Sequence, residues 1–372
     1  MENTILCKTI WISLLFVCIA AAKLCTAETG LEGREQVTLK GATAQFGVDI
    51  AGGAIIDFHL TGSQLNPFTW NYPEKGDIAP RPMGHFICFD RWGQPSEQEQ
   101  KNGMTFHGEA PYVVWKVLSK PSKQNGNISA QMLCTLPMGG MTLKRTIDLS
   151  DTSPVVKITE EITNINKLGR IFNIVQHPSI APPFLDESVI VDSNAWKGYM
   201  QESPWPNPEE PVIYWPSIAY KGKLVDLGRL DNDPDPAVVS FVFRDSVEYG
   251  WVTASNPGKG LMVGYIFKLS EYPWLNIWRN IKDGKPAARG LEFGTTGLHK
   301  PFGDMITKNT IFDRSLFEYC DANQTITKSY VLFLAEIPKG YKGVEEIEYS
   351  ENTIIIKEKE TTGKRDITIK MK

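Results

Sequence analysis

The chain has 372 residues, of which 42 % are hydrophobic and 22 % charged, as in ordinary globular proteins. This composition excludes collagen-like and coiled-coil repeats, intrinsic disorder and a multi-span membrane protein. With 39 Lys and Arg against 43 Asp and Glu the formal net charge is -4, so no excess of positive charge favours a nucleic-acid partner.

The first 27 residues have the order of a secretory signal peptide. Lys8 supplies a positive start, residues 10–22 form an apolar run, and small residues end at Ala27. The run is shorter than the roughly 20 residues that span a bilayer, and the residues before Cys25 disfavour a lipid anchor. We therefore predict a soluble exported protein, periplasmic or extracellular, with no stable membrane span.

The mature chain is predicted to consist of short strands that are rich in β-branched and aromatic residues. Alternation is clearest at 155–163, which predicts a half-exposed strand. Without a helical stripe in any 15-residue window, the pattern favours large antiparallel sheets packed face to face, and we expect one domain over 28–372. Predicted strands lie at 37–39, 53–60, 113–118, 128–136, 141–149, 155–163, 238–243, 260–267, 275–278 and 329–335.

Two segments differ from this pattern of strands. Residues 194–235 are rich in Pro, Trp, Asp and Asn, which predicts a long loop of the kind that carries binding residues. Residues 345–372 are predicted to form a C-terminal hairpin whose alternating Lys and Glu protect a sheet edge. A charged interaction tail is the alternative for this second segment.

The cysteines give little indication of bridges or metals. Cleavage after Ala27 would leave Cys88, Cys134 and Cys320, an odd number that does not suggest a disulfide scaffold, although one bridge stays open. No cluster has the spacing of a structural zinc site. We predict neither a metal nor a cofactor.

Two of the five histidines have settings that favour a function. His107 follows a polar, Gly-containing loop and precedes a predicted strand. His177 ends an apolar run and is followed by Pro178, which we expect to end or displace the strand and leave the imidazole beside a loop. A structural role is the common alternative for a lone histidine.

Residues 272–278 alternate so that Trp274 and Trp278 share one face with an amide, while apolar residues take the other. Aromatic rings pack on the CH-rich faces of sugars and amides bind hydroxyls, so this face suits a sugar; packing inside the protein explains it equally well. Glu292 projects from a predicted strand opposite to its apolar neighbours, where aromatic side chains could raise its pKa toward that of a useful base.

Three blocks carry a resemblance to a known family. Residues 81–108, 163–177 and 273–292 occur in an order that resembles the aldose 1-epimerase (galactose mutarotase) superfamily, closest to its hexose-6-phosphate epimerase-like branch. The resemblance covers about 37–335, nearly the whole mature chain. It implies an all-β, galactose mutarotase-like β-supersandwich of two large antiparallel sheets, with a carbohydrate bound in an open cleft.

The resemblance also implies an activity. Such an enzyme interconverts the anomers of a free sugar or an oligosaccharide reducing end by general acid/base ring opening, with no metal or nucleotide. By the resemblance Glu292 is the base and His177 the acid, His107 holds the sugar near its ring oxygen, and Arg81 lines the cleft.

Asp90 and Arg91 stand where the phosphate-sugar branch tends to have aromatic and Pro residues. We include them, with Trp274 and Trp278, among the substrate-binding candidates. A non-catalytic carbohydrate-binding protein on the same scaffold is the alternative function. A polysaccharide lyase is weaker because lyases on this type of scaffold often add a helical domain that the sequence lacks, and a hydrolase is weaker because no paired carboxylates have a recognisable spacing. The sequence leaves the oligomeric state open. Three residues are candidates for the family's additional substrate-binding aspartate: Asp192, Asp231 and Asp233.

Overall fold

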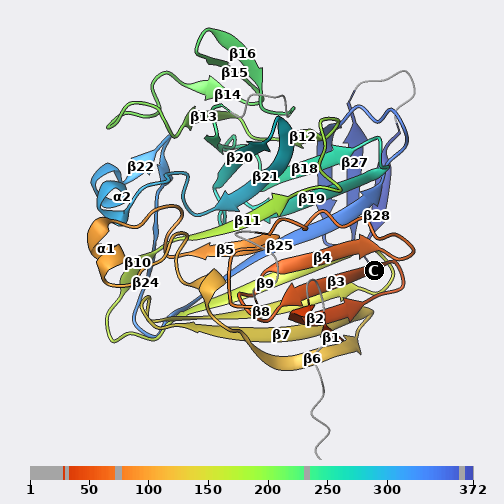
Figure 1. Cartoon of the computed structure of the whole chain (residues 1–372), viewed down its shortest axis with the longest axis horizontal. Helices are drawn as coiled ribbons and strands as arrows, with labels where there is room; N and C mark the ends of the chain where they lie inside the picture. The colour runs from red at the N-terminus through yellow and green to blue at the C-terminus, as the bar shows by residue number, and fades with distance from the viewer. Residues whose placement is uncertain (1–27, 30–32, 72–77, 230–234, 360–364, 372) are drawn as a thin grey trace, which may run out of the picture.

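Two large antiparallel sheets form the body of the protein (Figure 1). The structure is a computed structural model that describes residues 28–29, 33–71, 78–229, 235–359 and 365–371. The predicted signal peptide, 1–27, lies outside these ranges. Within them, no helix has both the length and the apolar character needed to cross a bilayer.

The larger sheet has eleven strands in the described part of the chain, and the second has eight. Both are antiparallel throughout, as the sequence predicts, and each of the predicted strands overlaps an observed one. The eleven-stranded sheet has the spatial order β1 (Glu28–Thr29), β2 (Glu35–Lys40), β3 (Ala44–Asp49), β4 (Ile55–Leu60), β5 (His85–Phe89), β11 (Ile174–Ile180), β21 (Lys285–Gly294), β20 (Trp274–Lys282), β17 (Val238–Val242), β13 (Lys197–Met200) and β14 (Ile213–Tyr214). The eight-stranded sheet has the order β12 (Ile190–Ser193), β18 (Tyr249–Asn256), β19 (Leu261–Lys268), β25 (Thr325–Glu336), β9 (Val155–Asn164), β8 (Met141–Ser150), β7 (Asn127–Leu136) and β6 (Lys116–Gln124).

The main core lies between the two sheets and follows from the alternation of their strands. On β8 every second residue from Met141 to Leu149 is buried, and β9 buries the alternate set that includes Ile158 and Ile162. The inward row of β9 includes one charge, Glu160, whose carboxylate accepts two N–H groups of Arg145 at 2.9 and 3.0 Å. Both side chains are fully buried, so this ion pair belongs to the core.

The side chains of β11 alternate between this core and the outer face of the eleven-stranded sheet. Gln176 points inward and donates to Glu160 at 2.7 Å, whereas His177 points outward and stacks on Phe86 of β5, with ring centroids 4.2 Å apart. The expectation that Pro178 ends the strand is wrong, because β11 continues to Ile180. The β11–β21 register has no paired residues at 177 and 178, where Pro lacks an N–H, while the pairing with β5 continues through Pro178.

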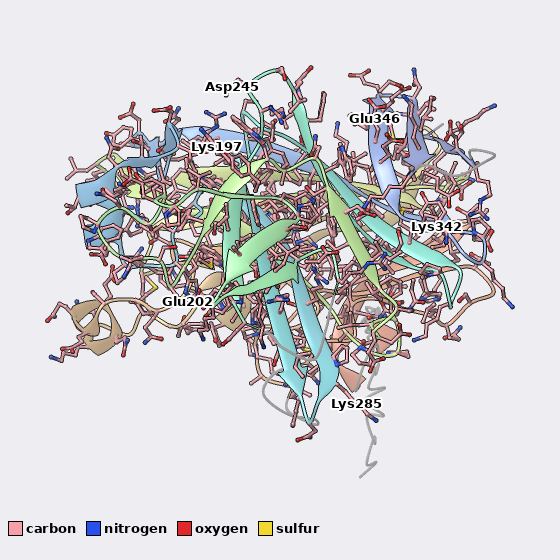
Figure 2. The ribbon with its side chains drawn as sticks, turned by 90° about the horizontal axis from the view of Figure 1, so that it is seen from above. Lys197, Glu202, Asp245, Lys285, Lys342 and Glu346 are labelled. Carbon is pink, nitrogen blue, oxygen red and sulfur yellow. The ribbon has the colours of Figure 1, made fainter. Side chains whose placement is uncertain are left out.

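Loops and short helices cover the outer face of the eleven-stranded sheet. Helices α1 (Glu97–Lys101) and α2 (Phe302–Lys308) lie beside each other at one end of it (Figure 1), and a 3-10 turn spans Ala110–Tyr112. The β20–β21 hairpin extends away from the body, with Lys285 at its tip (Figure 2). The remaining small pairs are β10 (Arg170–Phe172) with β24 (Glu318–Cys320), β15 (Ser217–Tyr220) with β16 (Lys223–Asp226), and β22 (Thr310–Ile311) with β23 (Arg314–Ser315).

The C-terminal segment forms a separate three-stranded sheet of β26 (Val344–Ser350), β27 (Thr353–Glu358) and β28 (Ile367–Lys370). β27 and β28 pair as the two arms of a hairpin, with Ile354 opposite Ile369. This sheet differs from the predicted hairpin that protects a sheet edge. Its apolar side packs on the outer face of the eight-stranded sheet, against Trp251 and Met262. The covering side of the small sheet must itself be apolar, and Ile354 and Ile356 of β27 make it so.

The three cysteines of the described ranges, Cys88, Cys134 and Cys320, are buried free thiols. The bridge that the sequence left open is therefore not formed among them.

Candidate functional site

A cavity of about 470 Å³ lies on the outer face of the eleven-stranded sheet, above β5, β11, β21 and β20. Its described lining is mainly aromatic and holds three imidazoles and one carboxyl group. No Lys or Arg occurs among these described lining residues. They are Trp70, Pro82, Phe86, Trp92, Phe106, His107, Tyr112, His177, Val238, Trp278, Asn280, Glu292 and His299.

His177 and Glu292 face each other across neighbouring strands. The register that pairs Gln176 with Phe293 and Ser179 with Gly290 sets these two residues opposite one another, and Nε2 of His177 lies 3.2 Å from Oε1 of Glu292. On its other side the imidazole Nδ1 is 3.0 Å from the hydroxyl of Ser179. The sheet thus brings an imidazole and a carboxyl group into contact inside an aromatic cavity.

Gly290 leaves room beside this pair. A Cβ at this position would lie 2.6 Å from Oε1 of Glu292 and 2.9 Å from Cβ of Trp278. Any larger residue would therefore displace one of two cavity side chains.

Burial makes both members of the pair neutral near pH 7. It raises the pKa of Glu292 to about 8, against a smaller opposing effect of the Trp92 N–H, and it lowers the pKa of His177 to about 3. The Glu292 carboxyl then carries the proton and can donate it to Nε2 of His177 over their 3.2 Å contact. The contact gives this proton a direct path from one group to the other.

Trp92 and Gly93 hold two of the cavity groups from one loop. The indole N–H of Trp92 donates to Oε2 of Glu292 at 2.6 Å, and the backbone N–H of Gly93 donates to Nδ1 of His107 at 3.1 Å. Since a backbone N–H can only donate, Nδ1 of His107 accepts, and the neutral ring carries its proton on Nε2. Burial also lowers the pKa of His107 well below its ordinary value, so this residue acts as a neutral donor.

Aromatic rings form the walls of the cavity. Trp278 lies edge to face with Trp70, their centroids 5.8 Å apart, and 5.8 Å from the His177 ring. Phe106 packs against His107 at 4.0 Å and is 44 % exposed, which puts it at the cavity mouth. Such walls fit the apolar faces of a ring-shaped ligand, and the imidazoles and the carboxyl provide the polar contacts.

The structure brings together four of the eight site residues that the sequence predicts: His107, His177, Trp278 and Glu292 all line the cavity. Trp274 shares a sheet face with Trp278 but is fully buried in a separate cluster, with its N–H donating to the Ser315 carbonyl at 3.0 Å. The packing interpretation therefore holds at one end of this aromatic face, and the cavity lies at the other.

Arg81, Asp90 and Arg91 are not among the described lining residues. Arg81 is buried and donates from Nε to the Asn71 side chain at 3.1 Å. Asp90 forms ion pairs with Arg170 at 2.6 Å and with Arg91 at 3.5 Å, and the Arg91 guanidinium also lies 4.1 Å above the Phe302 ring. These charges are bound to one another or to other groups of the protein, outside the cavity lining.

The predicted loop at 194–235 forms β13 to β16 in its described part, which contributes no lining residue. Of the three aspartate candidates, Asp192 is bonded to the Val344 backbone N–H at 2.7 Å, away from the cavity. Asp231 and Asp233 lie outside the described residues.

Sequence reasoning missed several members of the cavity that come from loops. Trp92 lay inside the first resemblance block, but nothing in the sequence linked its N–H to Glu292, 200 positions later. His299 carried no local signal beyond being one of five histidines, yet its ring packs 4.8 Å from Trp92. The missed lining residues include Trp70, Trp92, Phe106, Tyr112 and His299 outside the strands, and Phe86 and Asn280 on β5 and β20.

The Cys88 thiol, His107 and His177 offer donor atoms within 4.8 Å of one another, which raises the question of a metal site. Their chemistry does not suit one. Nδ1 of His107 accepts the Gly93 N–H, which leaves the proton on Nε2. Burial raises the pKa of the Cys88 thiol well above its ordinary value, so it is protonated in the metal-free protein.

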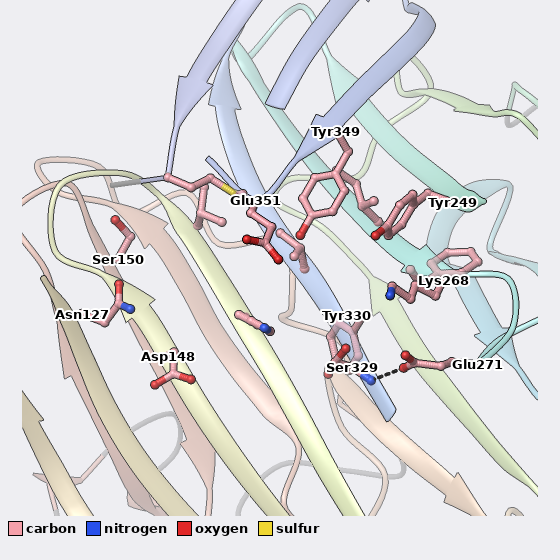
Figure 3. A pocket seen from close by; sticks show the side chains of 16 residues that line it. Asn127, Asp148, Ser150, Tyr249, Lys268, Glu271, Ser329, Tyr330, Tyr349 and Glu351 are labelled. Atoms are coloured by element: carbon pink, nitrogen blue, oxygen red, sulfur yellow. Dashed lines mark hydrogen bonds between the residues drawn. The ribbon is translucent and has the colours of Figure 1, made fainter. Parts of the chain in front are cut away.

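A second cavity, of about 510 Å³, lies between the C-terminal sheet and the eight-stranded sheet (Figure 3). Tyr249 and Tyr349 pack edge to face at 5.0 Å on one side of it, and the Glu271 carboxylate accepts the Ser329 backbone N–H at 2.5 Å on another. Among its described lining residues there is no imidazole and no contact between acid and base. We therefore place the candidate chemistry in the first cavity.

No protein-family model and no curated protein sequence matches the chain. Solved structures do. A galactose mutarotase-like protein from Clostridium acetobutylicum superposes with a TM-score of 0.60 at 15 % identity, over 82 % of this chain and 96 % of the other.

A Klebsiella pneumoniae protein provisionally assigned as an aldose 1-epimerase gives a TM-score of 0.61 at 14 % identity, over 83 % of this chain and 82 % of the other. A galactose mutarotase related enzyme from Lactobacillus acidophilus gives a TM-score of 0.58 at 11 % identity, over 82 % of this chain and 98 % of the other. Identities this low establish the architecture and not the activity. The chain has the galactose mutarotase-like fold.

Proposed function

We propose that this protein is an aldose 1-epimerase that interconverts the anomers of a free sugar or an oligosaccharide reducing end. The observation that carries the proposal is the contact of 3.2 Å between His177 and Glu292 in an aromatic cavity. Ring opening needs one group that takes the proton of the anomeric hydroxyl and another that protonates the ring oxygen, and this pair can do both.

The proton count of the pair fits the reaction. Transfer of the shared proton from Glu292 to His177 gives a carboxylate and an imidazolium. The carboxylate then takes the proton of the anomeric hydroxyl while the imidazolium protonates the ring oxygen, the C1–O5 bond breaks, and an open-chain aldehyde forms. Both groups are neutral again at this point, as burial favours. Rotation about C1–C2 and the reverse steps on the other carbonyl face give the second anomer.

The lining supports a sugar without a phosphate group. A bound phosphate usually needs Lys or Arg, and neither occurs among the described lining residues. The N–H on Nε2 of His107 is a suitable donor to a sugar hydroxyl or to the ring oxygen, and Trp278 with Trp70 offers faces for its C–H groups. We therefore favour a free sugar over a hexose 6-phosphate.

Anomer exchange catalysed by the protein tests the proposal directly. NMR exchange spectroscopy or polarimetry on fresh glucose, galactose and several uronic and deoxy sugars should show acceleration by the mature protein. Glu292→Gln and His177→Asn should each reduce the rate about 10²-fold or more, as the loss of a general base or acid does. Equal rates with and without the protein, for every sugar, would contradict the proposal.

A non-catalytic carbohydrate-binding protein is the second candidate, and one observation favours it. Both oxygens of Glu292 are already engaged, one by Trp92 at 2.6 Å and one by His177 at 3.2 Å. If these contacts persist around a bound sugar, the carboxyl cannot reach the anomeric hydroxyl. Calorimetry that detects sugar binding, together with exchange rates equal to the uncatalysed ones, would identify this function.

We also propose that the protein is exported and loses residues 1–27. The support is the order of positive, apolar and small residues in the sequence. Mass spectrometry of the protein from the extracytoplasmic fraction should give a chain that begins at Glu28, and an intact Met1 in that fraction would contradict cleavage.

A further inference from the structure

Two adjacent residues contact the two sides of the cavity. Trp92 reaches Glu292 through its indole N–H at 2.6 Å, and Gly93 reaches His107 through its backbone N–H at 3.1 Å. Gly93 also accepts the backbone N–H of His107 at 3.0 Å, so the two residues are joined in both directions. The carboxyl and the imidazole thus take their orientation from one short loop.

The loop itself is fixed by packing. Trp92 is 2 % exposed and meets the ring of His299 edge on, with centroids 4.8 Å apart. Gly93 has a φ of 92°, and a Cβ there would lie 2.3 Å from Nε2 of His299. Both the positive φ and the close ring require glycine. A loop so constrained places its N–H groups without further ordering when a ligand binds.

We propose that Trp92 and Gly93 are positioning residues for the acid/base chemistry of this site. Trp92 occupies one carboxyl oxygen of Glu292 and leaves the other for His177, and Gly93 fixes the proton of His107 on Nε2, where it serves as a donor to the ligand. This inference rests on the proposed function for its catalytic consequence, whereas the two orientations can be measured without any reaction.

Removing the Trp92 N–H should change the titration of Glu292 in a known direction. An N–H donor stabilises the ionised carboxylate, so its loss raises the pKa of Glu292 further. The other titratable groups near Glu292 are His177, which touches it, Cys88, whose pKa responds to its charge, and the cavity residues His107 and His299. Burial makes all four neutral around pH 7, so they provide no cation to replace the lost donor.

The test compares Trp92→Phe with Trp278→Phe, which also removes an indole N–H from the cavity wall but none bound to Glu292. The carboxyl of Glu292 is titrated by infrared difference spectroscopy, with Glu292→Gln to identify its band. Trp92→Phe should lower the ionised fraction of Glu292 at neutral pH about tenfold, the effect of losing one charge-assisted hydrogen bond. Trp278→Phe should leave the titration within about twofold of the parent.

Where the proposed reaction also occurs, Trp92→Phe should shift the alkaline limb of the pH–rate profile to higher pH. It should also lower kcat at neutral pH about tenfold. KM should change less than twofold, because the donor acts on the carboxyl and not on the sugar. A merely structural role would lower the amount of folded enzyme without shifting the profile.

A second measurement does not depend on the folding of Trp92→Phe. In the parent, one indole N–H resonance should titrate together with Glu292, and in Glu292→Gln no indole resonance should do so. Imidazole ¹⁵N spectra should show the His107 proton on Nε2. Identical Glu292 titrations in the parent and both Phe variants, indole resonances that ignore Glu292, or a proton on Nδ1 of His107 would each overturn the inference. Loss of anomer exchange alone, with these signals in place, would count against the proposed function instead.

Discussion

Replacing Glu292 with Gln should make the protein more stable in alkaline solution. The carboxyl is 1 % exposed, and burial raises its pKa from the ordinary 4.5 to about 8 in the folded state. The unfolded chain releases this proton at a lower pH than the folded protein does. The stabilisation that the protonated group gives at acid pH is therefore lost as the pH rises from 4.5 through 8.

The magnitude follows from this difference. A pKa that differs by one between the two states corresponds to about 1.4 kcal/mol, so between pH 5 and pH 9 the free energy of unfolding should fall by about 4 kcal/mol because of Glu292. In Glu292→Gln this fall disappears. The amide keeps the local contacts, because its oxygen can accept from Trp92 and its NH₂ can donate to Nε2 of His177.

Urea unfolding at pH 5 and pH 9 measures the effect. His177, whose pKa burial lowers to about 3, loses its stabilisation as the pH falls from 6.5 through 3. This contribution is present in parent and variant alike and cancels in the difference between them. Glu351→Gln, at an exposed position, is the matched control and should follow the parent. A variant that loses stability with rising pH in parallel with the parent would refute the reasoning.

Three further predictions concern the core, the aromatic face and the C-terminal sheet. Glu160→Gln should cost about 3 kcal/mol or more in urea unfolding because it leaves a buried guanidinium without its carboxylate, whereas Glu161→Gln, next to it but in a half-exposed pair with Lys144, should cost less than about 1 kcal/mol. Trp278→Ala should weaken sugar binding in calorimetry by about 1 kcal/mol or more and leave the free energy of unfolding nearly unchanged. Trp274→Ala should lower the free energy of unfolding by about 3 kcal/mol or more and change sugar binding little. A chain that ends after residue 337 uncovers the apolar face that the C-terminal sheet covers and should aggregate, as measured by light scattering; a monodisperse product would contradict this role.

The strands and their faces could be predicted from the sequence because alternation acts over a few residues. The pattern at 155–163 gives the buried row of β9, and alternation assigns Trp278 and Glu292 to the outer face of their strands. The same rule could not separate Trp274 from Trp278. Whether an outward ring meets a ligand or a covering loop depends on segments far away in the chain, here the carbonyl of Ser315.

His177 shows a different limit of sequence reasoning. The local rule that proline interrupts a strand holds for only one side of β11, where the pairing with β21 is absent at residues 177 and 178. The pairing with β5 does not need that N–H and continues through Pro178, and the pairing with β21 resumes at Ser179 and runs to Ile180. Which side of a strand a proline opens depends on the register with both neighbours, and the sequence does not contain that register explicitly.

The loop residues of the site could not be predicted for a related reason. Trp92 and His299 reach the cavity through contacts between segments about 200 residues apart. Their residue types are ordinary for a core, and only the folded arrangement distinguishes them from other buried aromatic residues.

The edge-to-face arrangement of Trp70 and Trp278, with centroids 5.8 Å apart, has an optical consequence. The transition dipoles of two indoles this close couple and split into a pair of circular dichroism bands of opposite sign in the far ultraviolet. The amplitude depends on the angle between the rings, so a guest molecule that tilts either ring changes the couplet while the backbone signal of the sheets stays constant. Circular dichroism should thus follow binding in this cavity without an added label.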